Sequence, residues 1–153
     1  MNKAELARQS RLHLDERFKE FGPASRFAPP VRGWIRAIRT ALGMSSAQLA
    51  KRLGVKQPSV VALEQSEMKG TIELATLRRV AAALDCALVY SLVPNEPLEV
   101  VVRDRARLFA RQRLEPIEHS MQLEDQEVTV KDFEARLDEF VRRTNPRLFW
   151  NQP

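Results

Sequence analysis

Hydrophobic residues recur along most of the chain every three or four positions, which is the spacing of one face of an α-helix. Residues 3–21 are predicted to form a charged amphipathic helix that ends at Gly22 and Pro23. The Pro-rich stretch 22–30 follows as an extended connector. The apolar positions of this first helix are Leu6, Leu12, Leu14, Phe18 and Phe21.

Four shorter helices are predicted next, separated by short turns. Gly43 and Gly54 end the first two, because glycine tolerates the left-handed backbone that commonly terminates a helix. Ser45 or Ser46 is a suitable N-cap of the second helix, and Pro58 is tolerated in the first turn of the third. The predicted ranges are 31–42, 47–53, 57–66 and 74–84.

The segment CALVYSLVP interrupts the helical spacing. Val89, Tyr90 and Val93 favour extended backbone, and Pro94 ends it, so a short strand is predicted over Ala87–Leu92. A single strand leaves its backbone groups and apolar faces without partners. Two partners fit the sequence equally well: another segment of this chain, or the same segment of a second copy.

Helical spacing returns beyond Pro94, and residues 98–113 and 130–143 are predicted to be helices. Between them lies an acidic stretch around SMQLEDQ, residues 120–126. The fold class is therefore mainly α. The predicted division is an N-terminal helical arm with its connector (1–29), a central domain that ends in the short strand (30–94), and a C-terminal helical region for dimerisation or partner binding (95–153).

The segment SAQLAKRLGVKQPSVVALEQ has the pattern of a helix-turn-helix. The two helices of this motif cross closely, which requires a small residue where they touch, and Ala50 is at that position. The turn requires a residue that tolerates positive φ, and Gly54 meets this requirement. The positions that must point inward are all apolar: Leu49, Leu53, Val55, Val60 and Leu63.

With the motif in this register, residues 31–84 resemble the Cro/phage-repressor-like, or Xre-type, family of DNA-binding domains. The resemblance implies a five-helix repressor-like core in which Gln57–Gln65 is the recognition helix that enters the major groove of DNA. In such motifs the N-terminal residues of the recognition helix face the base edges. The expected reading positions are Lys56, Gln57, Ser59 and Ala62.

These side chains suit different parts of the duplex. Gln57 can bond adenine in a bidentate manner, Ser59 can bond a base or a phosphate, and Ala62, with Val61, can contact thymine methyl groups. A solvated helix surface without any DNA contact is the alternative interpretation of the same residues. Phosphate contacts are expected from Lys56, Ser46 and Lys69, and are conceivable for Arg32 and Arg36.

The resemblance also implies a structural pair. In the family, an Arg of the first helix pairs with a Glu near the end of the recognition helix, and Arg39 and Glu64 match those positions. The role of this pair would be to orient the two helices, because loss of one partner leaves the other charge partly buried and unpaired. Many relatives place Gly soon after this Glu, whereas this chain has EQSE, so its exit loop is expected to differ.

The wider stretch PPVRGWIRAIRTALGMSSAQLAKRLGVKQPSVVALEQSEMKGTIELATLRRVAAALDCALVYSLVP is similar to the family called mobile mystery protein A, and SMQLEDQ fits it too. Members are typically encoded beside a Fic-domain protein on mobile elements. The resemblance therefore implies a toxin–antitoxin-like pair in which this chain is the DNA-binding partner. We expect an autoregulatory homodimer on a pseudo-palindromic operator in double-stranded DNA, because one recognition helix contacts too few base pairs for strong specificity.

Charge and cysteine content fit this hypothesis without proving it. The net charge is +5, and its positive excess lies in the first two thirds, since residues 94–153 have ten Lys/Arg against twelve Asp/Glu. A basic soluble protein of any function would account for the total equally well. The single cysteine, Cys86, excludes an internal disulfide. With no apolar leader or membrane span in the sequence, we expect a cytoplasmic protein.

Two rival classes of function remain. An enzyme is not expected, because His13, His119 and Cys86 lie far apart without metal-ligand or nucleophile spacing, and no metal or cofactor is implied. Cys86 is expected in the core, and His13 at the surface. The second rival is a protein-binding antitoxin or adaptor with secondary DNA binding. Its apolar docking surface would be formed by Phe133, Leu137, Phe140, Leu148, Phe149 and Trp150. Packing of these residues against the protein's own helices would explain their apolar character equally well.

Overall fold

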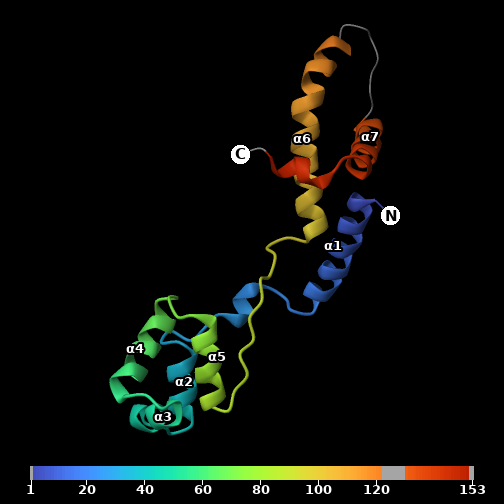
Figure 1. The fold of residues 1–153 in the computed structure, drawn as a ribbon. Helices are drawn as coiled ribbons and strands as arrows, with labels where there is room; N and C mark the ends of the chain where they lie inside the picture. The colour runs from blue at the N-terminus through green and yellow to red at the C-terminus, as the bar shows by residue number, and fades with distance from the viewer. Residues whose placement is uncertain (1, 122–129, 152–153) are drawn as a thin grey trace. The chain divides into compact units, whose positions relative to one another are not determined.

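The computed structural model describes residues 2–121 and 130–151, and all regular secondary structure in these ranges is helical (Figure 1). The predicted mainly α fold class is confirmed. Most of the acidic stretch 120–126 lies outside the described residues. The chain forms two compact units: residues 25–92, and the two chain ends, 1–24 and 93–153, together.

The unit of residues 25–92 has four α-helices, whereas five were expected for its core. Cys86 N donates to Ala81 O (2.8 Å), and Asp85 adopts a positive φ of 57°. This turn ends the last helix, and no fifth helix follows within the unit. The four helices are α2 (Trp34–Ala41), α3 (Ser46–Leu53), α4 (Gln57–Met68) and α5 (Leu74–Ala83).

All four helices contribute side chains to one apolar core. Leu49 of α3, Val60 of α4 and Val80 of α5 are fully buried. Ile35 of α2 and Leu84, just after α5, complete the buried cluster. Burial of a Leu, Ile or Val side chain contributes about 1.5–3 kcal/mol, so these contacts are the main cohesive force of the unit.

Ser45, and not Ser46, is the N-cap of α3. Its hydroxyl accepts from Gln48 N (3.2 Å), and the Gln48 side chain accepts in return from Ser45 N (2.8 Å). This reciprocal arrangement satisfies two donors of the first turn. Gly54 ends the helix in the left-handed conformation, with φ of 69°, as the sequence predicts.

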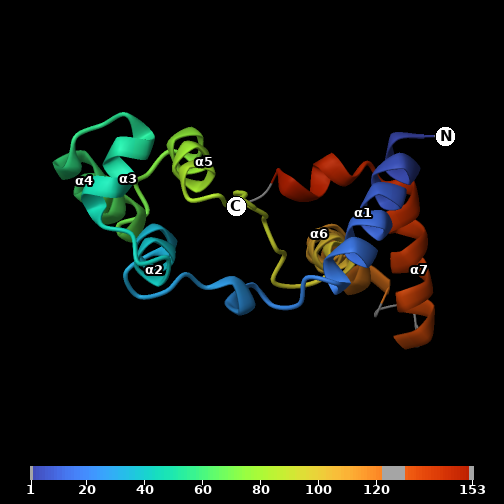
Figure 2. The ribbon, with the colours of Figure 1, turned by 90° about the horizontal axis from the view of Figure 1, so that it is seen from below.

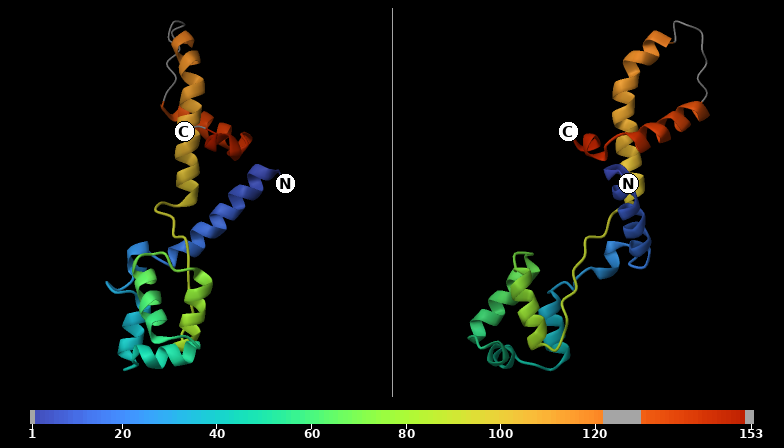
Figure 3. Two further views of the ribbon diagram at one scale, coloured as in Figure 1. Left: turned by 60° about the vertical axis from the view of Figure 1, so that its left-hand side comes forward. Right: turned by 45° about the vertical axis from the view of Figure 1, so that its right-hand side comes forward.

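The predicted strand over Ala87–Leu92 is not formed: these residues have no regular secondary structure (Figure 3). A strand requires a neighbouring strand, and the described residues contain none. Cys86, expected in the core, is exposed instead. Its position directly after the turn at Asp85 puts it outside the packed face of α5.

The other unit is built from α1 (Lys3–Lys19), α6 (Leu98–Met121), α7 (Val130–Arg143) and the 3-10 helix η3 (Pro146–Trp150). The N-terminal helix α1 lies against α6 and α7 (Figure 2). The connector contains one further 3-10 turn, η1 (Ala24–Phe27). Residues from opposite ends of the sequence therefore share one unit.

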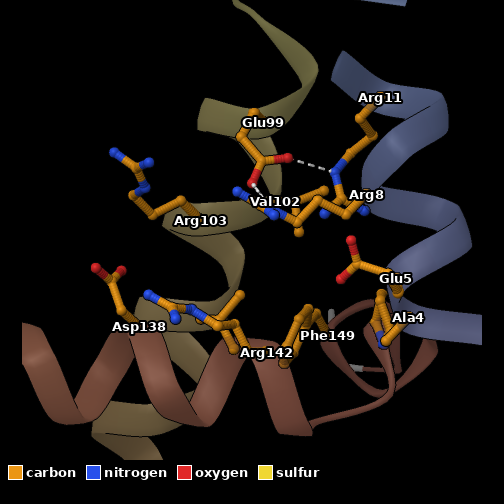
Figure 4. Close-up of a pocket in the computed structure, with 12 residues that line it drawn as sticks. Ala4, Glu5, Arg8, Arg11, Glu99, Val102, Arg103, Asp138, Arg142 and Phe149 are labelled. Carbon is orange, nitrogen blue, oxygen red and sulfur yellow. Dashed lines mark hydrogen bonds and ion pairs between the residues drawn. The ribbon is translucent and has the colours of Figure 1, made fainter. Parts of the chain in front are cut away.

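Polar contacts fix α1 against the start of α6. The Asp15 carboxylate accepts from Leu98 N (2.7 Å) and Glu99 N (3.0 Å), and so caps the N-terminus of α6 from a different helix. Arg11 donates to Glu99 at 2.8 Å, and Arg8 lies 3.7 Å from the same carboxylate (Figure 4). Charges of both signs line the small hollow beside these groups.

The C-terminal aromatic residues are largely internal. Phe149 is 3% exposed and packs edge-on against Phe109 at 5.6 Å between ring centroids. Phe140 stacks on the same ring at 5.9 Å. Trp150 stays half exposed, with the Arg105 guanidinium 5.6 Å from its ring. Leu137 is buried too, whereas the Phe133 side chain is outside the described residues.

Candidate nucleic-acid interface

Helices α3 and α4 form the crossing pair that the sequence pattern predicts. Ala50 is 3% exposed, so its methyl group allows close approach of the two helices. Val55 N donates to Ala50 O (3.0 Å) in the turn at Gly54. Leu53, Val55 and Leu63 pack against the buried cluster. The inward positions of the motif are thus occupied by the residues assigned to them.

The N-termini of α3 and α4 meet at two of the predicted DNA-binding residues. Gln57, the first residue of α4, donates through Nε2 to the Ser46 hydroxyl at 2.9 Å, and Ser46 is the first residue of α3. The first turn of a helix has unpaired N–H groups that attract phosphate. The hydrogen bond joins a candidate base-reading amide to a candidate phosphate-binding hydroxyl.

The first turns of α4 present the remaining reading positions to solvent. Lys56, the N-cap of α4, and Ser59 and Ala62 are exposed together with Gln57. Val61 is 44% exposed beside them. Lys69 is exposed at the opposite end of α4, as its C-cap, and so lies between three and four helical turns from Lys56. The structure thus brings Ser46, Lys56, Gln57, Ser59 and Ala62 to one end of the motif and separates Lys69 from them.

Two exposed cations, one just before α2 and one on it, lie beside the second half of α4. Arg32 and Arg36 are both exposed and line a hollow of about 220 Å³. An arginine at such a position reaches phosphate oxygens with a bidentate fork. The other lining residues are Val61, Glu64, Gln65 and Met68 of α4.

Arg39 and Glu64 form an ion pair between α2 and α4. Arg39 Nε donates to Glu64 Oε1 at 2.6 Å, and Arg39 also donates to Met44 O at 2.9 Å. The two side chains are 14% and 9% exposed, so little water competes with the pair. The contact ties α4 to α2 and to the loop before α3.

Glu67 makes a second connection, which the sequence reasoning did not assign. Its carboxylate accepts from Trp34 N and Ile35 N, each at 2.9 Å, and caps the N-terminus of α2. The N-cap residue of α2 is Gly33, which has no side chain to do this. A methyl group at Gly33 would lie 2.6 Å from Glu67 Oε2. The glycine therefore leaves the space that the carboxylate occupies.

A sequence signal for this cap did exist. Residues 27–33, directly before Trp34, contain no Ser, Thr, Asp or Asn, so α2 starts without a local side-chain cap. Glu67 lies three positions after Glu64 and therefore on the same side of α4, toward α2. The run EQSE, noted as a departure from relatives, is the segment that supplies the cap.

The charge of this unit is strongly positive. Residues 25–92 contain ten Lys/Arg and four Asp/Glu. Two of those acids are engaged with α2: Glu64 is buried and Glu67 is half-buried. The outward-facing charge is consequently more positive than the total indicates, which favours a polyanionic partner.

Comparison with known proteins agrees with this geometry. Residues 35–91 match the model of the helix-turn-helix family, and the match supports the Xre/Cro-like superfamily for this part of the chain. Neither a curated protein nor a solved structure matches the chain. No helix in residues 2–121 and 130–151 is long and apolar enough to cross a membrane.

The fold and the match together indicate a DNA-binding transcription regulator. Helix-turn-helix domains of this kind generally have no catalytic role. Of the positions considered for catalysis, His13 lies exposed on α1 and Cys86 follows α5. The side chain of His119 lies outside the described residues.

Proposed function

We propose that this protein is a sequence-specific transcription regulator that binds a pseudo-palindromic operator as a homodimer. One recognition helix contacts too few base pairs for strong specificity, so two copies would share the operator. The main observation in support is the exposed N-terminal end of α4, where Gln57 donates a hydrogen bond to Ser46 at the neighbouring end of α3. The strongly basic unit around it supports the proposal.

Within this proposal, the direct readers are Gln57, Ser59 and Ala62. The Gln57 amide has the donor and acceptor that adenine requires, and the bond to Ser46 would hold the amide in place before DNA arrives. Phosphates would be held by Ser46, Lys56 and Lys69, with Arg32 and Arg36 beyond them.

We further propose an antitoxin-like regulator that controls its own promoter and is paired with a Fic-domain protein. The support is the similarity of residues 29–94 to mobile mystery protein A. The alternative is a protein-binding antitoxin or adaptor with secondary DNA binding. Its specific support is the half-exposed Trp150 with the 39% exposed Leu148, which leave apolar surface on the second unit.

Fluorescence anisotropy of the full chain with DNA upstream of its own reading frame tests the regulator. A scrambled duplex and two salt concentrations complete the design. We expect tighter binding to the native duplex, and the double variant Gln57→Ala/Ser59→Ala should lose that preference. Loss of one bidentate contact costs about 1–3 kcal/mol, or roughly fivefold to 150-fold in affinity.

A matched control removes the same two residue types elsewhere. Gln9→Ala/Ser10→Ala changes an exposed Gln and Ser of α1, in the other unit, and should leave the preference intact. Weak and equally salt-sensitive binding of the parent to both duplexes would indicate phosphate attraction alone. That result would favour the protein-binding alternative.

A further inference from the structure

Residues 87–92 are an uncharged segment without regular secondary structure, and most of their apolar side chains face solvent. Val89 is 82% exposed, Tyr90 67% and Leu92 88%. These values are high for residue types that proteins usually bury. None of the backbone–backbone hydrogen bonds among the described residues involves this segment. Its backbone and its side chains therefore both lack the partners that a strand would have.

The segment has sharp limits at both ends. Asp85, with its positive φ, turns the chain out of α5, and Pro94 cannot donate to a strand ladder. Beside its first half lies an apolar hollow of about 310 Å³, between α2 and α5. Leu88 lines that hollow and is half buried, so the segment is seated on its own domain at one end only.

We propose that a second copy of this chain pairs its own residues 87–92 with this segment as an antiparallel two-stranded ladder. The inference rests on the proposed dimeric regulator and names its interface. Backbone donors and acceptors of an extended segment are met by another extended segment. The segment has no Asp, Glu, Lys or Arg, so pairing with itself brings no like charges together. A charged peptide, in contrast, would find no opposite charge in this segment.

Symmetry fixes which registers are possible. Two identical antiparallel strands are related by a two-fold axis perpendicular to the sheet, which keeps every side chain on its own face. One residue must then lie opposite itself. If that residue is Tyr90, Leu88 faces the partner's Leu92, so the three large side chains of this face, at positions 88, 90 and 92, all lie opposite one another. An axis at Val89 would instead put Leu92 opposite Cys86, outside the segment. We therefore assign the axis to Tyr90.

Cysteine cross-linking of the full chain tests this register. The background is Cys86→Ser, which removes the exposed native thiol. Opposite Cβ atoms are about 4.5–5.5 Å apart and diagonal ones about 7–8 Å, so only opposite positions suit a disulfide. We expect Tyr90→Cys to form a disulfide-linked dimer under mild oxidation, and Val89→Cys and Ser91→Cys alone to form little.

A mixture of the Val89→Cys and Ser91→Cys chains supplies the matched control. In the assigned register residue 89 faces residue 91 of the other copy, so the mixture should cross-link although neither chain does so alone. Cross-linking of all positions alike, or of Val89→Cys alone, overturns the register. No cross-link at any position overturns the interface.

A second set of variants separates the ladder from side-chain packing. Val89→Pro and Tyr90→Pro each remove a backbone donor, and because alternate residues of a strand point their N–H groups at the same neighbour, one of the two should give a monomer by light scattering. Tyr90→Ala keeps the backbone donor and should dimerise more strongly than that proline variant. Dimers of both proline variants overturn the proposal. These readouts use no DNA, so a cross-linked dimer that binds native and scrambled duplexes equally would refute the proposed function and leave the interface standing.

Discussion

At the scale of residues, two carboxylates of α4 hold the recognition helix against α2. Glu64 pairs with Arg39, and Glu67 caps the two leading backbone donors of α2. Charged hydrogen bonds contribute about 1.5–3 kcal/mol each. The outward side of the same helix has the candidate reading residues. A change on the inner side should therefore act on the placement of α4 before it acts on chemistry.

Gly33→Ala tests the cap at this scale. The new methyl group would lie 2.6 Å from Glu67 Oε2, and φ of 81° strains any side chain. We expect a loss of about 2–3 kcal/mol in the free energy of unfolding, measured by urea denaturation. Gly70→Ala is the matched control, because its φ is 69° but nothing lies within 4 Å of its Cβ.

The cap accounts for part of the difference between the two glycines. Gly70→Ala should lose about 1 kcal/mol from backbone strain alone. In a Glu67→Ala background, the additional loss caused by Gly33→Ala should shrink to the strain of its own backbone, which at φ of 81° and ψ of 163° is a conformation that essentially only glycine adopts. Equal losses for Gly33→Ala and Gly70→Ala in the parent chain would contradict the role of Glu67.

At the scale of elements, the ion pair orients α4 as a whole. Arg39 contacts Glu64 of α4 and the Met44 carbonyl before α3, so one side chain links three parts of the motif. Loss of one partner leaves the other charge in a site that is only 9–14% exposed. The cost lies in stability, because neither side chain is among the candidate base readers.

Glu64→Ala should lower the unfolding free energy by about 3 kcal/mol and leave the ranking of operator variants unchanged. Thermal melting followed by anisotropy on matched duplexes measures both quantities. Glu73→Ala removes an exposed carboxylate at the N-cap of α5 that makes no capping bond, and should be nearly silent in melting. Equal melting temperatures of the parent and Glu64→Ala proteins would contradict a stabilising role of the Arg39–Glu64 pair.

At the scale of the whole molecule, each unit contains one of the two tryptophans. Trp34 begins α2, and Trp150 ends η3. In a Trp34→Phe background, the remaining fluorescence reports only the unit that α1 shares with α6 and α7. The stability of that unit can thus be measured inside the full chain.

Asp15→Ala in this background should destabilise the second unit by about 1–2 kcal/mol. The substitution removes both capping bonds at Leu98 N and Glu99 N. Urea denaturation followed through Trp150 gives the value. Glu16→Ala changes the neighbouring exposed acid, which pairs only with Lys19 among the described contacts, and should shift the midpoint little. A silent Asp15→Ala would refute the capping role.

The sequence predicted the parts of this molecule that depend on local chemistry. Helix starts and ends followed from Ser45 and Gly54, and the inward positions of the motif followed from the spacing of its apolar residues. Contacts between distant residues were not predictable in this way. Glu67 and Asp15 each cap a helix far away in sequence, and neither partner is visible in a local pattern.

The predicted strand over Ala87–Leu92 illustrates the same limit, since local propensity does not predict a distant partner. Val89 and Tyr90 favour extended backbone, and the segment lacks helix, but propensity alone cannot provide the neighbouring strand that a ladder needs. Helix α1 gives a similar example. Its residues Leu6, Leu12 and Leu14 follow helical spacing but stay at least 37% exposed. The periodicity predicted the helix but not how much of its apolar face is buried by other residues.

The capping of α6 by Asp15 has a consequence for the order in which the chain folds during synthesis. The ribosome releases residues 25–92 between the two halves of the second unit, so α1 emerges long before Leu98 exists to be capped. The helix-turn-helix unit can complete its contacts first, because all of them lie within that continuous stretch. By folding, it also shortens the loop that α1 and α6 must close, and so reduces the entropy lost when the chain ends finally meet.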